Sequence, residues 1–216
     1  MNQNIIKRIL SSIIIITIAF FFIIKGSFFF IFFMSIFFLV TAYEWYQMNR
    51  KSNYLLPGFI FLSFSTYSAY LLKGTTNTEE FYFLMVILVC VATDIGGYIF
   101  GKIFKGPKLI KISPNKTYAG MFGGFFLSII SVNFFFNYAY EFNLGYKIND
   151  FTQEVFILVL LISSVSQIGD LVMSYFKRKS KIKNTGKILP GHGGLLDRVD
   201  GIIFAIPFAY LLFKFI

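Results

Sequence analysis

Long apolar stretches separated by short polar segments dominate this sequence. Seven of them reach, or nearly reach, the roughly 20 mostly apolar residues that a membrane-spanning helix needs. They lie at about residues 5–24, 28–43, 55–72, 81–100, 118–138, 154–174 and 199–216. The pattern predicts an all-α integral membrane protein, a polytopic bundle of about seven transmembrane helices that forms a single transmembrane domain over residues 1–216.

The composition excludes a soluble protein. Hydrophobic residues fill 56% of the 216 positions and charged residues only 14%, whereas a soluble domain averages roughly 25% charged residues. The same figures exclude a disordered basic tail, and the single cysteine, Cys90, excludes an internal disulfide framework.

Lys7 and Arg8 precede the first apolar stretch as in a signal peptide. Because Lys25 and Gly26 follow it, and no small-residue cleavage site does, we expect a retained helix.

The basic residues are divided unequally between the two sides of the predicted bundle. With the N-terminus in the cytoplasm, sixteen of the twenty Lys and Arg lie on the inner side. The outer side then holds the remaining four, Lys25, Lys73, Lys147 and Lys214. Because loops rich in Lys and Arg stay cytoplasmic, this division predicts a cytoplasmic N-terminus and, with seven helices, an external C-terminus. The two longest inner loops are predicted at residues 101–117 and 175–198.

Four aspartates stand at the cytoplasmic ends of predicted helices: Asp94, Asp170, Asp197 and Asp200. Since a carboxylate in the hydrocarbon region is costly, intramembrane acids usually face a bundle interior and bind something. Local pairing, for example of Asp197 with Arg198, is the alternative. Ligands that are all oxygen favour Mg²⁺, whereas one histidine and one cysteine argue against a zinc site.

Two polar segments near these aspartates suit a phosphate-bearing ligand. Residues 190–194 (PGHGG) predict a tight turn with exposed backbone N–H groups before a helix. Residues 113–117 (SPNKT) place Lys116 and Thr117 at the start of another helix. His192 in such a turn is more often a hydrogen-bond donor than a general base. No GxxxxGK[ST] or GxGxxG motif occurs, so the known soluble nucleotide-binding loops are excluded.

Residues 174–200, SYFKRKSKIKNTGKILPGHGGLLDRVD, carry a specific resemblance. They resemble the C-terminal signature of the phosphatidate cytidylyltransferases, also called CDP-diacylglycerol synthases. The segments TDIGGYIFGK (93–102), SPNKTYAG (113–120) and SQIGDL (166–171) are also similar to that family. The resemblance implies N-terminal helices over residues 1–80 and catalytic helices with cytoplasmic loops over 81–216.

The resemblance also implies an activity, a cofactor and partners. The expected enzyme is a Mg²⁺-dependent nucleotidyltransferase of phospholipid biosynthesis, which joins CTP and phosphatidate to give CDP-diacylglycerol and pyrophosphate. Asp170 and Asp197 match the family's metal ligands, and the family pattern allows a second cation. We expect membrane lipid as surroundings, no nucleic acid partner, a homodimer as in relatives, and a bacterial inner membrane with the active site on its cytoplasmic side.

Residues and resemblance together define the candidate site. The predicted catalytic residues are Asp170, Asp197, Asp200, Lys177, Arg178 and His192. The predicted substrate-binding residues are Asp94, Ser113, Lys116, Thr117, Lys183, Lys187, Gly191, Gly193, Gly194 and Arg198.

The chain departs from the family pattern at Asn184, where Asp is usual, and at Ala119 and Met173, where Glu is usual. Other functions are a different membrane enzyme, such as a lipid kinase or a CDP-alcohol phosphatidyltransferase, the same transfer to another lipid, and transport. A CDP-alcohol phosphatidyltransferase normally carries DGxxAR, which residues 200–205 (DGIIFA) do not fit. Cytidylyl transfer to another lipid phosphate stays open. A transporter would place acids at mid-membrane or on both sides, whereas these aspartates gather near one side.

Overall fold

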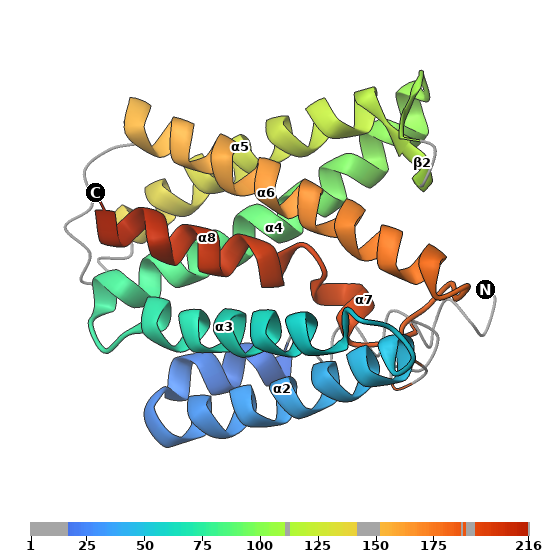
Figure 1. Ribbon diagram of the computed structural model, residues 1–216. Coiled ribbons are helices and arrows are strands. Elements are labelled where there is room, and N and C mark those ends of the chain that lie inside the picture. Colours follow the sequence, from blue (N-terminus) through green and yellow to red (C-terminus); the bar gives the residue numbers. More distant parts are fainter. Residues whose placement is uncertain (1–16, 111–112, 142–151, 187, 189–192, 216) are drawn as a thin grey trace, which may run out of the picture. The chain divides into compact units, whose positions relative to one another are not determined.

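The computed structural model describes residues 17–110, 113–141, 152–186, 188 and 193–215 (Figure 1). Within these ranges five helices are long and apolar enough to cross a membrane, and they confirm an all-α membrane protein. They are α2 (Ser27–Asn49), α3 (Leu55–Lys73), α4 (Asn77–Phe104), α5 (Tyr118–Glu141) and α6 (Gln153–Lys179). Two shorter helices follow, α7 (Leu196–Val199) and α8 (Ile202–Phe215).

The remaining two predicted spans are covered only in part. Residues 17–25 are helical and end at Gly26, whose φ of 60° lies in the region that glycine adopts without strain, but residues 5–16 lie outside the described ranges. The last predicted span contains α8, which has 14 residues. The number of seven transmembrane helices therefore stays a prediction.

Two predicted loop boundaries are wrong, because α4 and α6 each continue four or five residues into the predicted loops. The loops were expected from residues 101 and 175, whereas α4 ends at Phe104 and α6 at Lys179. Backbone hydrogen bonding carries a helix on where side chains become polar. A hydropathy pattern marks only the apolar part of each helix.

A short hairpin, which the hydropathy pattern did not predict, fills most of the segment between α4 and α5. Strands β1 (Lys108–Ile110) and β2 (Ser113–Thr117) pair antiparallel, with Lys108 opposite Thr117 and Ile110 opposite Ser113. Strand β2 leads directly into α5 at Tyr118, as expected for residues 113–117 at the mouth of a helix. Positive φ angles at Lys105 and Gly106 mark where α4 ends.

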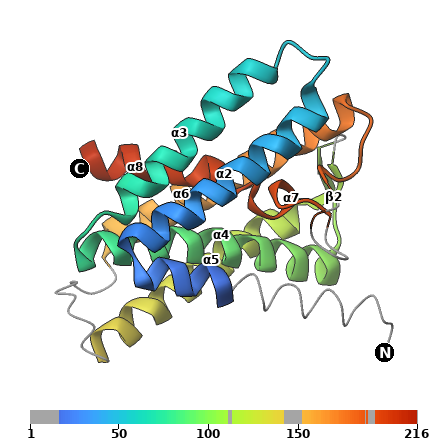
Figure 2. The same ribbon diagram turned by 90° about the horizontal axis from the view of Figure 1, so that it is seen from below.

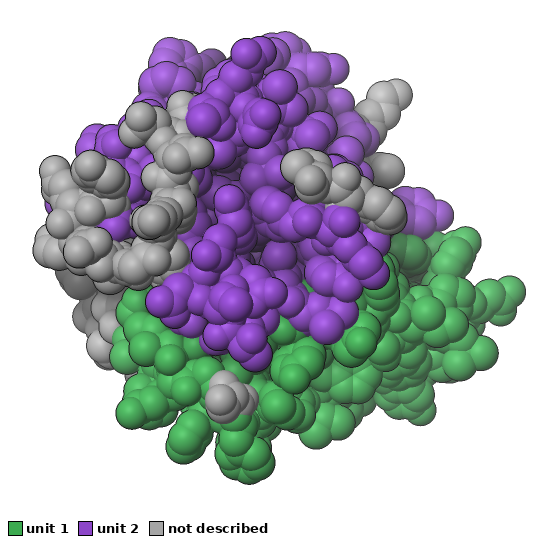
Figure 3. Space-filling model, turned by 90° about the vertical axis from the view of Figure 1, so that its left-hand side faces the viewer, with its two compact units in different colours: residues 1–70, 176–199 green, residues 71–175, 200–216 purple. Residues whose placement is uncertain are grey.

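The chain forms two compact units, coloured separately in Figure 3. Unit 1 comprises residues 1–70 and 176–199, and unit 2 comprises residues 71–175 and 200–216. In unit 1, the indole Nε1 of Trp45 donates to the carbonyl of Leu55 at 3.1 Å. Gly58 leaves room for this indole, since a Cβ there would lie 1.9 Å from Trp45 Cε2. These contacts join α2 to the start of α3.

Unit 2 is organised by close packing of α4 against α5, which lie side by side in both ribbon views (Figures 1 and 2). A Cβ at Gly96 would lie 2.3 Å from the carbonyl oxygen of Gly123, and one at Gly120 would lie 2.7 Å from that of Gly97. Glycines at these positions allow the two backbones to approach, as small residues do between membrane helices. The approach brings the last turns of α4 next to β2 and the start of α5.

Helix α6 completes the part of unit 2 that surrounds the candidate site. The hydroxyls of Thr93 on α4 and Ser163 on α6 lie 2.7 Å apart in a buried hydrogen bond. Gln167 Nε2 donates to the carbonyl of Met121 on α5 at 3.4 Å. These bonds set the rotation of α6 about its axis, and Asp170 lies one turn beyond Gln167.

Candidate functional site

A cavity of about 200 Å³ with several polar side chains in its lining lies in unit 2, between α4, the hairpin, α5 and α6. Four of the predicted site residues line it together: Asp94, Lys116, Thr117 and Asp170. Sequence reasoning had not proposed Thr93, Tyr98 or Gln167, which also line it. Thr93, Tyr98 and Gln167 fall inside the motif segments 93–102 and 166–171, so those motifs mark the cavity better than the charged residues alone.

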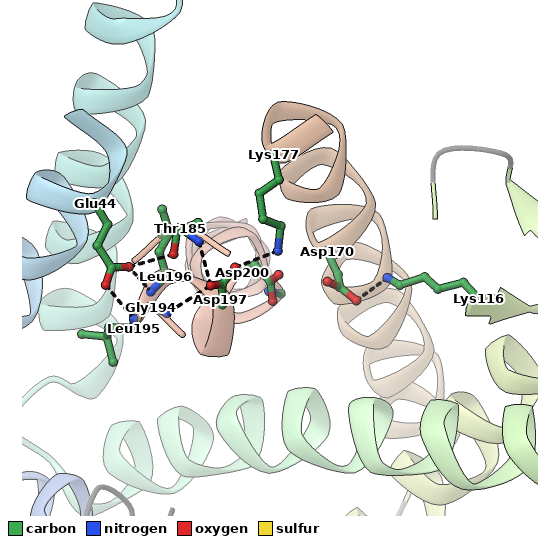
Figure 4. A network of polar contacts seen from close by, with 11 residues as sticks. Glu44, Lys116, Asp170, Lys177, Thr185, Gly194, Leu195, Leu196, Asp197 and Asp200 are labelled. Carbon is green, nitrogen blue, oxygen red and sulfur yellow. Dashed lines mark hydrogen bonds and ion pairs between the residues drawn. The ribbon is translucent and has the colours of Figure 1, made fainter. Parts of the chain in front are cut away.

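The central contact of this cavity is an ion pair between Lys116 Nζ of β2 and Asp170 Oδ2 of α6 (Figure 4). Each side chain keeps 26% of its surface exposed. A pair that is partly open can exchange its internal contact for an external one. The ammonium group can meet a phosphate, and the carboxylate can meet a cation.

The oxygen-rich lining fits a hard cation bound together with phosphate. Asp94 and Asp170 offer carboxylates, and Thr93, Thr117 and Gln167 add hydroxyl and amide oxygens. Among the described residues, no three His, Cys, Asp or Glu side chains gather as a metal cluster. Mg²⁺ does not need such a cluster, because it is usually held by one or two carboxylates, several waters and substrate phosphates.

A second polar network lies in unit 1 around Asp197. Its Oδ1 accepts from Lys177 Nζ at 3.0 Å, and its Oδ2 accepts from the backbone N–H groups of Thr185 at 2.8 Å and Gly194 at 3.1 Å (Figure 4). The Asp197 side chain is 7% exposed and that of Lys177 is 14% exposed. Asp197 therefore joins the C-terminal end of α6 to the residues on both sides of segment 186–193, called the glycine-rich segment below.

Glu44 of α2 is part of the same network, and sequence reasoning missed it. Glu44 is 1% exposed. Its Oε2 accepts from the Thr185 hydroxyl at 2.9 Å and from the N–H of Leu196 at 2.8 Å, and its Oε1 accepts from the N–H of Leu195 at 2.9 Å (Figure 4). The predicted apolar stretch ends at residue 43, just before Glu44, whereas α2 continues to Asn49 and places this acid inside the helix.

Comparison with known proteins identifies the family. The family described as the cytidylyltransferase family matches residues 59–216, well over half of the chain. The chain belongs to the cytidylyltransferase family. A phosphatidate cytidylyltransferase from Rickettsia typhi is 35% identical over 208 residues, which cover 95% of this chain and 90% of the relative.

Two staphylococcal relatives, also named phosphatidate cytidylyltransferase, match a shorter region. The protein of Staphylococcus aureus (strain COL) is 43% identical over 135 residues, which cover 61% of this chain and 48% of the relative. The protein of Staphylococcus saprophyticus is 39% identical over 142 residues, which cover 65% and 52%. The matches span about half of these two relatives' length.

In this member of the cytidylyltransferase family, the predicted site residues fall into two groups. Asp94, Lys116, Thr117 and Asp170 line the cavity of unit 2, and Lys177, Gly194 and Asp197 join in the network of unit 1. Both aspartates that match the family's metal ligands form an ion pair with a lysine. The alternative of local pairing named Arg198 as an example of a partner for Asp197, and the ion pair that the structure shows joins Asp197 to Lys177, twenty positions earlier in the chain.

The other predicted residues are placed as follows. Arg178, Lys183 and Arg198 are exposed, Ser113 is half-buried in β2, and Gly193 adopts a positive φ of 88°. Asp200 is 6% exposed, and its Oδ1 accepts from the N–H of Gly201 at 3.2 Å. Lys187, Gly191 and His192 lie outside the described residues.

Proposed function

We propose that this chain transfers the cytidylyl group of CTP to phosphatidate and releases pyrophosphate, forming CDP-diacylglycerol for phospholipid synthesis. The observation that carries the proposal is the similarity to the Rickettsia typhi phosphatidate cytidylyltransferase, which extends over nearly the whole of both chains. The cavity of unit 2 supports it, because it combines carboxylates with a lysine in the motifs of this family.

The reaction requires charge control more than proton transfer. A phosphate oxygen of phosphatidate forms a bond to the α-phosphorus of CTP, and the bond from that phosphorus to the β-phosphate oxygen breaks. The attacking group is already an anion, so no strong base is needed. Two polyanions must meet, however, and preorganised positive charge lowers their repulsion and stabilises the leaving pyrophosphate. We propose Lys116 and Lys177 for this task, since each becomes available to a phosphate once a bound cation takes over its carboxylate partner.

Mg²⁺ is the proposed cofactor, with Asp170 and Asp197 as its proposed ligands and a second cation allowed. The oxygen donors in the cavity of unit 2 fit such an ion at Asp170. At Asp197, Oδ2 is held by two backbone N–H groups, so Oδ1, which accepts from Lys177, is the oxygen that can turn to a cation. When bound, the metal would supply charge stabilisation to the phosphates.

The remaining residues keep proposed roles that follow the family resemblance. Asp200, Arg178 and His192 are proposed as catalytic. Proposed contacts to CTP or to the lipid phosphate come from Asp94, Ser113, Thr117, Lys183, Lys187, Gly191, Gly193, Gly194 and Arg198.

We further propose seven transmembrane helices with a cytoplasmic N-terminus, a bacterial inner membrane, a cytoplasmic active site and a homodimer. The division of basic residues supports the orientation, because sixteen of twenty lie on the proposed cytoplasmic side. The bacterial relatives agree with the proposed membrane.

Pyrophosphate release tests the proposed substrate pair. The purified protein in detergent is incubated with phosphatidate, Mg²⁺ and one of the four ribonucleoside triphosphates. Of the four nucleotides, we expect only CTP to release pyrophosphate, and only when phosphatidate is present. Chelation of Mg²⁺ should abolish the release. Equal release with all four nucleotides, or release without the lipid, would contradict the proposal.

A further inference from the structure

The buried carboxylate of Glu44 bonds to a segment more than 140 positions away in the sequence. Its three donors are the Thr185 hydroxyl and the N–H groups of Leu195 and Leu196. Hydrogen bonds to a charged acceptor are among the stronger ones in proteins. A residue 1% exposed that receives three of them is built into the structure and is not a solvated acid.

The chain leaves space for this carboxylate. A Cβ on Gly186 would lie 2.6 Å from Glu44 Oε1, and a Cβ on Gly194 would lie 2.4 Å from Glu44 Oε2. Both positions therefore need glycine as long as Glu44 stays in place. Two glycines of the family signature thus have a role toward Glu44 that is separate from any contact with phosphate.

Glu44 and Asp197 hold the same short segment by different groups. The N–H of Thr185 donates to Asp197 while its hydroxyl donates to Glu44. On the far side of the glycine-rich segment, Gly194 donates to Asp197, and Leu195 and Leu196 donate to Glu44. The two carboxylates therefore fix residue 185 and residues 194–196, which flank residues 186–193.

We infer that Glu44 is a positioning residue for cytidylyl transfer, which holds the two ends of the glycine-rich segment and keeps Asp197 in place. The inference rests on the proposed function for its catalytic part. It adds a residue from α2, outside the region 59–216 that matches the family. The hydrogen bonds recorded for Glu44 among the described residues go to Thr185, Leu195 and Leu196, so its effect is expected to pass through the segment that it holds.

Glu44→Gln is the main test variant, because it keeps the shape of the side chain and replaces one acceptor oxygen with an NH₂ donor. Oε1 and Oε2 each face at least one N–H group, so either orientation of the new amide places an NH₂ against a backbone donor. The loss of one charge-assisted hydrogen bond changes the equilibrium between the held and the released segment by roughly tenfold or more. We expect kcat/KM for CTP to fall at least about tenfold, with KM for phosphatidate nearly unchanged.

Thr41→Val is the matched control. Thr41 is fully buried on the same helix, one turn earlier, and its hydroxyl donates only to carbonyls of α2 itself among the bonds recorded for it. This variant should keep kcat/KM for CTP within about threefold of the wild type. An equal loss in both variants would show a general effect on α2 and would overturn the inference.

Thr185 separates positioning from mere stability. Thr185→Val removes the hydroxyl bond to Glu44 but leaves the N–H bond to Asp197, whereas Thr185→Ser keeps both. We expect Thr185→Val to lower the rate of cytidylyl transfer and Thr185→Ser to retain most of the wild-type rate. The double variant Glu44→Gln with Thr185→Val should lose less than the product of the two single losses, since both remove one shared contact. Independent, multiplicative losses would contradict the coupling.

Amide hydrogen exchange gives a readout that does not need turnover. In Glu44→Gln the peptide covering residues 193–199 should exchange faster than in the wild type, and in Thr41→Val it should not. Unchanged exchange in Glu44→Gln would overturn the inference even in an active enzyme. If the wild type makes no CDP-lipid, the proposed function and the catalytic part of the inference fail, while the exchange still decides whether Glu44 holds the segment.

Discussion

At the scale of single residues, each of the two groups of candidate residues contains a carboxylate paired with a lysine. Asp170 pairs with Lys116 and Asp197 with Lys177, and both pairs are only partly accessible to solvent. Such pairs keep opposite charges together in a poorly solvated region, where a lone charge would be costly. We expect the same groups to part when a nucleotide with its cation enters, because phosphates and the cation then provide the opposite charges.

Asp170→Asn tests the carboxylate in the cavity of unit 2. The variant keeps the size of the side chain but loses its charge, so we expect most of the turnover to be lost while the thermal midpoint stays near that of the wild type. Glu80→Gln is the control, because Glu80 pairs with Lys73 in the same unit but does not line the cavity. Near-normal rates in Asp170→Asn would remove this residue from the proposed metal site.

Asn184→Asp tests the departure from the family pattern. Asn184 is exposed, and its side chain lies beside Gly193, whose Cβ would come 3.1 Å from Asn184 Cγ. Since an exposed carboxylate is easily solvated, we expect steady-state assays to show little loss of kcat/KM, or a gain. A collapse of kcat/KM would mean that another group in this chain replaces the usual aspartate.

At the scale of elements, the sequence predicts the helices well and their contacts poorly. The stretches predicted at 55–72 and 118–138 agree with α3 and α5 to within a few residues, because apolar length alone marks a membrane helix. The hairpin was missed, since strands of three and five residues carry little pattern. The bonds from Glu44 to residues 185–196 were missed because nothing in a local pattern reports a contact over such a separation.

Adjacent glycines on α4 test the close packing that shapes the cavity. A methyl group at Gly96 would lie 2.3 Å from the Gly123 carbonyl oxygen, whereas one at Gly97 would lie 3.6 Å from that of Gly120. We expect Gly96→Ala to destabilise unit 2 by roughly 1–3 kcal/mol, the usual cost of overpacking. Gly97→Ala should be neutral or slightly stabilising, since Ala favours helices over Gly.

Thermal unfolding in detergent measures both glycine variants. The Gly96→Ala protein should unfold at a clearly lower temperature than the wild type, and the Gly97→Ala protein should not. Equal midpoints for the two variants would show that α4 and α5 do not approach as closely as described.

At the scale of the whole molecule, the net charge of +10 matters through its distribution. The proposed cytoplasmic side carries sixteen basic residues and, at the ends of its helices, the aspartates of the candidate site. A basic surface of this kind raises the local concentration of anionic substrates such as a nucleoside triphosphate. The sequence alone predicted this grouping by side, but not which aspartate meets which lysine, because that depends on how the helices pack.

Cysteine labelling tests the proposed orientation. Asn53 and Thr75 are exposed and flank α3 at opposite ends, so a single spanning helix places them on opposite sides of the membrane. Native Cys90 is buried and should give little background. In intact cells a membrane-impermeant maleimide should label Thr75→Cys and spare Asn53→Cys until the cells are lysed. The reverse pattern would overturn the cytoplasmic N-terminus.

The most direct test of the central claim follows the label of CTP into lipid. The purified wild-type protein receives phosphatidate, Mg²⁺ and CTP labelled at either the α- or the γ-phosphate, beside a known phosphatidate cytidylyltransferase as positive control. We predict that the α-label enters the organic phase as CDP-diacylglycerol and that the γ-label stays in water as pyrophosphate. Absence of α-label from the lipid, while the positive control transfers it, would contradict the account.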